Sequence, residues 1–333
     1  SLSIEDMIAE EEMVLTITHN GYIKRTSLST YRSQRRGGRG VQGASSREED
    51  FVEHLFVANT HSYILFFTDK GKCYWVKVYD IPEGGRAAKG RAIVNLIGCE
   101  PDEKVSAFIS VKEFNEDHYV VMATEKGMVK KTKLSAYSNP RKKGIYAVEI
   151  RDGDRLIEAR VSTGDNDILL GTRNGKSIRF SEEQIRASGR KTMGVKGITL
   201  SSEDDRLVGM LLIKREGTVL VATEKGFGKR TEISQYRAQK RGGKGVLTMK
   251  TTDKVGKMVT IKEVVDKDDL MIITNQGVLI RLPVAQIRSI GRATQGVKLI
   301  KLGEGTLVSS ITRIMSEEEE DENNNTESTD PKE

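Results

Sequence analysis

The chain contains Gly21-Tyr22-Ile23-Lys24-Arg25-Thr26, then Tyr31-Arg32, then Gln34-Arg35-Arg36-Gly37-Gly38-Arg39-Gly40. Each segment returns 205 positions later (226 against 21), as Gly226-Phe227-Gly228-Lys229-Arg230-Thr231, Tyr236-Arg237 and Gln239-Lys240-Arg241-Gly242-Gly243-Lys244-Gly245. An offset that stays constant without a gap indicates a chain built from repeats. It also places a basic, glycine-rich loop inside the repeated unit.

The chemistry of this loop suits a polyanion. Glycine allows positive φ and lets the backbone approach a ligand closely. Arginine carries a planar guanidinium whose donors match phosphate oxygens. A flexible Arg-Gly linker would have the same composition, but duplication within a fixed framework favours a binding loop.

Charge is distributed unevenly along the 333 residues, whose formal net charge is +6. Residues 316–333 hold nine acidic groups and one lysine, a net of −8. The other residues therefore carry 53 basic groups (54 − 1) and 39 acidic groups (48 − 9), a net of +14. A body of this sign attracts nucleic acid or an anionic membrane, whereas an acidic tail is typical of a disordered appendage.

The sequence also predicts the cellular compartment of the protein and whether the chain is part of a longer one. The sequence has no apolar run near eighteen residues and no signal segment, which predicts a soluble cytoplasmic protein that is not exported and has no membrane partner. Cys73 and Cys99 are unclustered, as expected of buried thiols in a reducing compartment. Because the chain begins at Ser1 without a methionine, we expect a fragment of a longer protein.

A tight-turn glycine recurs at intervals of 50, 56, 48, 51 and 51 residues. Before each one lies a β-branched or aromatic run, such as 13–18, and after it an alternating run, such as 22–26. This pair predicts a β-hairpin. A period near fifty residues with short strands predicts a propeller-like array. The six glycines are Gly21, Gly71, Gly127, Gly175, Gly226 and Gly277.

Three further positions repeat in register with the turn glycine. Ten residues after it stands a large apolar side chain, predicted to be a core anchor: Tyr31, Ile81, Tyr137, Ile185, Tyr236 or Ile287. Four residues after it stands a cation in five units, with Trp75 as the exception. Nineteen residues after it stands another glycine, except that the third unit is two residues shorter and uses Gly144. The loop around this second glycine holds three cations in every unit.

Each unit is predicted to contain about four strands, the size of one propeller blade. A third strand is expected after each loop (Val41, 92–94, 145–150, 195–200, 246–249 and 297–302), and a fourth before the next hairpin. The last fourth strand, 307–314, has no hairpin after it, so we expect it to pair back onto the first blade and cover an exposed edge. Residues 1–12 are predicted to be a linker, 13–315 the folded domain, and 316–333 a disordered acidic tail.

No constellation typical of catalysis or of a bound cofactor stands out. The four histidines lack metal-ligand spacing, and residues 85–91 lack the ending of a P-loop. We therefore expect no catalytic residue, no metal and no cofactor in this stretch of chain.

The segment Gln34–Gly40, in its frame, resembles the signature Gln-Arg-Arg-Gly-Gly-Lys-Gly of the C-terminal domain of the A subunit of bacterial DNA gyrase. Arg39 replaces the lysine and keeps its charge, and the copy at 239–245 has Lys240 in place of the first arginine. The likeness covers essentially residues 5–315. It implies an all-β, six-bladed β-pinwheel that wraps and bends duplex DNA around a basic rim and directs strand passage towards negative supercoiling.

The resemblance also implies partners: the gyrase B subunit with its ATPase, and the N-terminal cleavage region of the same polypeptide. It implies a nucleoid-associated, non-catalytic part of an ATP-dependent type IIA topoisomerase, and an isolated domain that is monomeric. Two alternatives stay open. One is the equivalent domain of topoisomerase IV, whose heptapeptide is broken or missing, and the other is a propeller that binds acidic proteins.

The predicted DNA-binding residues are the heptapeptide and the repeated cations around it. They are Gln34, Arg35, Arg36, Gly37, Gly38, Arg39, Gly40, Lys24, Arg25, Arg32, Arg86, Lys89, Arg91, Lys131, Arg141, Lys142, Lys143, Arg179, Arg190, Lys191, Lys196, Arg230, Lys240, Arg241, Lys244, Arg281, Arg288, Arg292 and Lys298.

Overall fold

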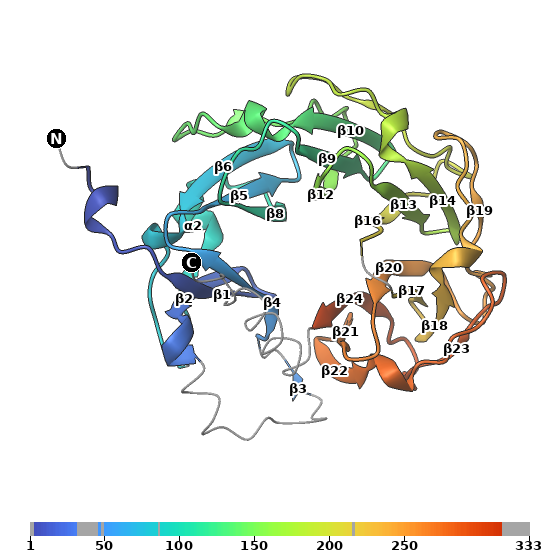
Figure 1. The fold of residues 1–333 in the computed structure, drawn as a ribbon. Coiled ribbons are helices and arrows are strands. Elements are labelled where there is room, and N and C mark those ends of the chain that lie inside the picture. Colours follow the sequence, from blue (N-terminus) through green and yellow to red (C-terminus); the bar gives the residue numbers. More distant parts are fainter. Residues whose placement is uncertain (1–2, 32–45, 48–49, 86, 215–216, 315–333) are drawn as a thin grey trace, which may run out of the picture.

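Six four-stranded antiparallel sheets stand around a central axis, as the blades of a propeller (Figure 1). The computed structural model describes residues 3–31, 46–47, 50–85, 87–214 and 217–314. This architecture confirms the predicted all-β class, the six units and the four strands per blade. Within the described residues, no helix is long and apolar enough to cross a membrane.

From the axis outwards, the strand order of the six blades is the same. Blade 1 is β4(Val52–Asn59), β1(Glu12–Thr18), β2(Tyr22–Ser27), β7(Arg91–Ala92); blade 2 is β8(Val105–Val111), β5(Tyr63–Thr68), β6(Lys72–Lys77), β11(Ile145–Tyr146). Blade 3 is β12(Leu156–Ser162), β9(Tyr119–Thr124), β10(Met128–Lys133), β15(Val195–Lys196); blade 4 is β16(Leu207–Leu212), β13(Asp167–Thr172), β14(Lys176–Ser181), β19(Val246–Leu247). Blade 5 is β20(Met258–Val264), β17(Thr218–Thr223), β18(Phe227–Glu232), β23(Val297–Lys298); blade 6 is β24(Val308–Ile314), β21(Asp269–Thr274), β22(Val278–Pro283), β3(Ser46–Arg47).

Each hairpin turns on the predicted glycine. Gly21 has a φ of 85°, and its five equivalents also have positive φ, which an L side chain rarely adopts. The threonine three residues earlier fixes the turn in most blades: in the first, Tyr22 N donates to Thr18 Oγ1 at 3.1 Å. The spacing Thr-x-x-Gly therefore encodes the turn locally.

The outermost strand of each blade comes from the next unit along the chain. β7 pairs with β2, β11 with β6, and the exchange continues around the propeller until β3 of the first unit pairs with β22 of the last. The sequence did not predict this exchange. These outer strands contain only two residues, and 93–94, predicted as strand, begin the helix α2(Ile93–Ile97), which ends at Gly98 with φ 63°.

The prediction for the last strand was wrong. β24 stays in blade 6, where it pairs with β21, and does not extend the sheet of blade 1. The outer edge of blade 6 is covered instead by β3 of the first unit, which pairs with β22. Between β24 and β4 the structure has a side-chain hydrogen bond, from Thr312 Oγ1 to Glu53 Oε1 at 2.7 Å.

The hydrophobic core lies between blades. Five clusters of buried side chains join blade 1 to 2, 2 to 3, 3 to 4, 4 to 5 and 5 to 6. The predicted anchors contribute to them: Ile81, Tyr137, Ile185, Tyr236 and Ile287 are buried, and Tyr31 is half-buried. Most anchors follow or end a short 3-10 helix: η2(Val78–Asp80), η3(Leu134–Tyr137), η4(Glu182–Gln184), η5(Ile233–Gln235) and η6(Val284–Gln286); η1(Glu5–Met7) precedes blade 1.

Candidate nucleic-acid interface

The basic loops of units 2 to 6 all lie at the outer edge of the propeller. Each loop leads directly into an outermost strand, such as β19 or β23, and Figure 1 shows these two strands on the perimeter. The loop of unit 1, with Arg32 and the heptapeptide Gln34–Gly40, lies outside the described residues, as does Arg86. The described loops are thus brought to a common edge although they are some fifty residues apart in sequence.

Two groups of cations can be separated by their contacts. In the first group, the side chains are exposed and make no hydrogen bond or ion pair with the residues that the structure describes. Lys89 and Lys298 in this group lie over the rings of Tyr22 and Phe227. The exposed loop cations are Lys89, Arg91, Arg141, Lys142, Lys143, Lys191, Lys196, Lys240, Lys244, Arg288 and Lys298.

The second group attaches one unit to the next. The residue four positions after the turn glycine donates to a backbone carbonyl of the following unit: Arg25 Nε to Ile81 O at 2.6 Å, Arg179 Nη1 to Tyr236 O at 3.0 Å, and Arg230 Nε to Ile287 O at 2.9 Å. Lys131 Nζ reaches Glu182 O at 3.1 Å. Arg281 pairs with Asp269 of its own hairpin at 2.7 Å.

Trp75, the exception in the sequence pattern, performs the same structural role. Its indole Nε1 donates to Tyr137 O at 2.8 Å. What the position requires is therefore an N–H donor of sufficient reach, and positive charge is secondary. This contact explains why tryptophan replaces a cation there.

Lysines three positions after the turn glycine form a further set that the sequence analysis recognised only at Lys24. Lys24 Nζ donates to Gly85 O and Ala88 O, both at 2.9 Å. Lys130 Nζ donates to Ala147 O and Arg190 O. Lys229 Nζ donates to the carbonyls of Gly291, Arg292 and Thr294.

Lys130 and Lys229 are almost completely buried, at 2% and 0% exposure. Burial, with a neighbouring guanidinium as a smaller cause, lowers the pKa of each amine to about 7.

Only odd-numbered units carry this lysine; units 2, 4 and 6 have Tyr74, Ile178 and Ile280. The anchor alternates in the same way between tyrosine and isoleucine, so the odd-numbered and even-numbered blades are of two types.

A third attachment comes from an arginine four residues before the loop glycine. Arg241 Nε donates to Gln184 O at 3.0 Å and its Nη1 to Lys196 O at 2.7 Å. Arg292 makes the equivalent bonds to Gln235 O and Leu247 O, and Arg190 Nη1 donates to Tyr146 O at 3.0 Å. These arginines join each loop to the preceding one.

The loop glycine is required by close approach. Gly194 has a φ of 81°, and a Cβ there would overlap Val129 O; at Gly245 it would overlap Ser177 O. The glycines therefore let each loop lie directly on the backbone of the preceding blade. No group of three or more metal-ligating side chains occurs in the described ranges, and Cys73 (buried) and Cys99 (half-buried) are free thiols.

A six-bladed propeller whose exposed loop cations gather on its outer edge is the class of protein that the fold and these loops define. A family model described as "DNA gyrase C-terminal domain, beta-propeller" matches six segments, one for each unit: 12–59, 62–112, 118–163, 166–214, 217–264 and 268–314. The chain belongs to this family, which confirms the resemblance carried by the repeats and the heptapeptide.

Curated relatives agree with this membership. The chain is 48% identical over 320 residues to the A subunit of DNA gyrase from Staphylococcus epidermidis, covering 95% of the chain and 36% of the relative. It is 46% identical over 332 residues to its Staphylococcus aureus counterpart, covering 99% and 37%. The chain thus spans little more than a third of the length of these relatives.

Two solved structures are also similar. The crystal structure of the C-terminal domain of DNA topoisomerase IV superposes with a TM-score of 0.84 at 26% identity, over 97% of this chain and all of the other. The structure of a DNA gyrase A C-terminal domain superposes with a TM-score of 0.70 at 23% identity, over 92% of this chain and all of the other. The second match supports the fold alone.

Proposed function

We propose that this chain binds duplex DNA along its outer edge, bends it around the blades, and so directs strand passage towards negative supercoiling within a gyrase. The observation that carries the proposal is the group of exposed loop cations that have no ion pair among the described residues and gather beside the outermost strands of successive blades. Cations at one edge of a repeating fold form a track for phosphates, which recur along DNA independently of sequence.

Within the predicted DNA-binding residues, we propose a division of roles. The exposed loop cations contact phosphates. Lys24, Arg25, Lys131, Arg179, Arg190, Arg230, Arg241 and Arg292 hold the loops in place, because their donors are bonded to backbone carbonyls of other units. Arg281 is held by Asp269 and fixes its own hairpin.

The energetics are compatible with bending. Bending a 20–30 bp site by 40–90° costs on the order of 1–6 kcal/mol. About ten phosphate contacts would give a log–log salt slope of roughly −9, a contribution that can offset this cost at low salt. Because loops of arginine, lysine and glycine offer few base-specific donors, we expect weak sequence preference.

In the complete enzyme, the partners would be the gyrase B subunit and the N-terminal cleavage region of the same polypeptide, with the chemistry of ATP hydrolysis and strand cleavage located there. This proposal rests on family membership and on the names of the relatives. The isolated chain would then act as a monomeric, non-catalytic module of a bacterial cytoplasmic topoisomerase.

The test is the topology of a nicked plasmid that is sealed in the presence of the chain. Wrapping predicts a shift in linking number that grows with protein concentration and disappears at high salt. Replacing Arg35, Arg36 and Arg39 by alanine should leave DNA affinity partly intact through the other loops while abolishing supercoiling by the complete enzyme. A plasmid whose linking number does not respond to the wild-type chain would refute wrapping.

The equivalent domain of topoisomerase IV remains the second candidate, favoured by the TM-score of 0.84. Such a domain would bind and bend DNA without supporting the introduction of negative supercoils. The supercoiling assay with the complete enzyme separates the two.

A further inference from the structure

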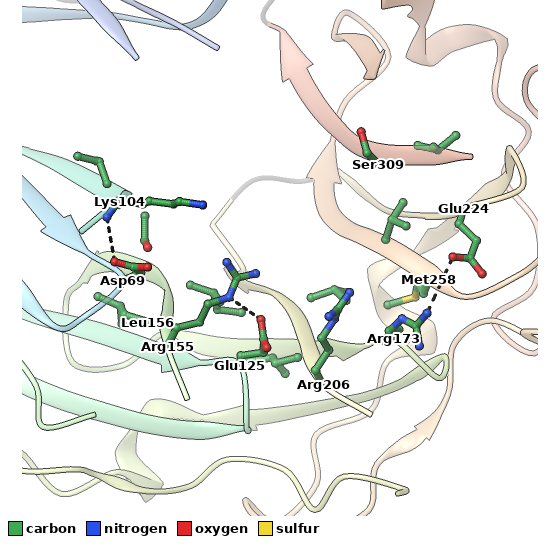
Figure 2. Close-up of a pocket in the computed structure, with 17 residues that line it drawn as sticks. Asp69, Lys104, Glu125, Arg155, Leu156, Arg173, Arg206, Glu224, Met258 and Ser309 are labelled. Atoms are coloured by element: carbon green, nitrogen blue, oxygen red, sulfur yellow. Dashed lines mark hydrogen bonds and ion pairs between the residues drawn. The ribbon is translucent and has the colours of Figure 1, made fainter. Parts of the chain in front are cut away.

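The central channel of the propeller opens at one end into a cavity of about 510 Å³ (Figure 2). Its walls come from the starts of five innermost strands, β8, β12, β16, β20 and β24, and from the hairpin turns beside them. This volume lies in the range of small-molecule sites. The innermost strands line this cavity, whereas the basic loops lead into the outermost strands. The cavity is therefore separate from the proposed DNA track.

A repeated pair of residues surrounds this end of the channel. In every blade, the residue two positions before the turn glycine donates its backbone N–H to the carbonyl of the residue that precedes the innermost strand. We call these the mouth pairs. They are His19–Phe51, Asp69–Lys104, Glu125–Arg155, Arg173–Arg206, Glu224–Lys257 and Asn275–Leu307.

The mouth pair of blade 4 breaks the charge pattern. Blades 2, 3 and 5 have an acid followed by a base, and in blade 3 the two side chains form an ion pair, Arg155 Nε to Glu125 Oε2 at 2.6 Å. Blade 4 has two arginines. The backbone N–H of Arg206 donates to Asp205 Oδ1 at 2.9 Å, as that of Arg155 does to Asp154 Oδ1 in blade 3, but the pair of blade 4 has no carboxylate to face the Arg206 guanidinium.

The positive charge of blade 4 is only partly neutralised, because Asp204 interacts electrostatically with Arg173 but no carboxylate pairs with Arg206 in the described residues. The guanidinium of Arg206 is exposed and makes no hydrogen bond or ion pair within the described part of the chain, and Arg173 Nη2 lies 4.0 Å from Glu224 Oε2, the limit of an ion pair. Glu224 is already engaged, since its Oε1 accepts from Lys257 N at 3.0 Å. Figure 2 shows Arg155, Arg206 and Arg173 along the same wall of the cavity.

From this arrangement we propose that the mouth of the central channel is a binding site for a compact diphosphate or triphosphate group, held by Arg206 and Arg173 with Arg155 beside them. Guanidinium groups are planar forks that match phosphate oxygens in pairs. Arg173 and Arg206 from blade 4, with Arg155 from blade 3, suit an anion with more than one phosphoryl group. The carboxylates of Glu125 and Glu224 border the site and would disfavour anions that bind elsewhere along the wall.

The experiment is calorimetric titration of the whole chain with inorganic pyrophosphate. We expect one site per chain that is stronger than the weak binding at the outer loops. Arg206→Ala should weaken it roughly tenfold or more, because a hydrogen bond to a charged group is lost. Arg173→Glu should abolish it, because the introduced carboxylate recreates the acid–base pair of the other blades and neutralises Arg206.

The matched control is Lys257→Ala, which removes the base of the mouth pair in blade 5 but does not line the cavity. It should leave pyrophosphate affinity unchanged. Thermal unfolding of each variant establishes that it is folded. A wild-type chain without a one-to-one site, a site that survives Arg173→Glu, or equal losses in Lys257→Ala would each overturn the proposal. DNA binding by Arg173→Glu should equal that of the wild type, so the outcome is independent of wrapping.

Discussion

The third and fifth loops occupy equivalent places on the propeller but use their cations differently. In the fifth loop, Arg241 binds the carbonyls of Gln184 and Lys196 and so attaches the loop to its neighbour. In the third loop, which is two residues shorter, Pro140 stands at that position, and Arg141, Lys142 and Lys143 are all exposed. We propose that positive charge at this edge has two separable uses, attachment of loops and binding of phosphate, and we expect that each can be removed without the other.

The largest expected effect is on stability, through loss of the lysine that attaches the sixth loop to blade 5. Lys229→Met removes a buried ammonium and leaves the carbonyls of Gly291, Arg292 and Thr294 without their donor. We expect a loss of about 2–4 kcal/mol in the free energy of unfolding, since buried acceptors without partners carry a full desolvation penalty. Urea unfolding measures it. Lys244→Met, at an exposed position of the fifth loop, is the control and should change stability little; equal stabilities of the two variants would contradict the attachment role.

The next effect in size is on the affinity for DNA and on its salt dependence. Replacing Arg141, Lys142 and Lys143 together by alanine should weaken DNA binding roughly tenfold or more at low salt and reduce the log–log salt slope by about 2.7, because three phosphate contacts are lost. The free energy of unfolding should stay within about 0.5 kcal/mol of the wild type, as expected for exposed positions. Fluorescence anisotropy at several salt concentrations gives both affinity and slope. An unchanged slope would show that the third loop is not on the DNA path.

A smaller effect is expected at the fifth loop. Arg241→Ala should cost about 1 kcal/mol of stability, because it removes two partly exposed hydrogen bonds to carbonyls. Its effect on DNA affinity should be less than that of the triple substitution in the third loop. Arg237→Ala, an exposed arginine of the same loop, is the control for loss of charge alone. If both variants weaken DNA binding equally without loss of stability, Arg241 belongs to the phosphate-binding group.

Much of the fold could be predicted from the sequence because its determinants are local. The turn glycines and the apolar runs around them specify hairpins, and the anchors at Tyr137 or Ile185 indicate a core with a fifty-residue period. The exchange of the outer strand could not be predicted in the same way. A two-residue segment such as 246–247 has the same period whether it pairs within its own unit or with the preceding one, and only the structure distinguishes them.

The sequence predicted basic residues at repeated loop positions, but not which of them bond to backbone carbonyls and which are exposed. Arg25 and Arg141 are both basic residues at repeated positions, and composition cannot tell a guanidinium bonded to Ile81 O from one that is exposed at the edge. One signal was present in the sequence: Trp75 at a position otherwise cationic indicates a need for an N–H donor. A second signal was the alternation of Lys24, Lys130 and Lys229 with Tyr74, Ile178 and Ile280, which distinguishes odd-numbered from even-numbered blades.

The last expected effect concerns pH and sharpens the attachment role of Lys229. Burial lowers the pKa of this amine to about 7, below the ordinary value of 10.5 that it has when the chain is unfolded. Between these two values the unfolded chain binds the extra proton, so the free energy of unfolding of the wild type should rise with pH relative to Lys229→Met. The neutral amine can still donate to two of the three loop carbonyls, without the cost of a buried charge. Urea unfolding of both proteins at pH 6.5, 7.5 and 8.5 measures the difference, which should grow across the series; a constant difference would mean that the carbonyls of residues 291–294 keep the ammonium charged throughout.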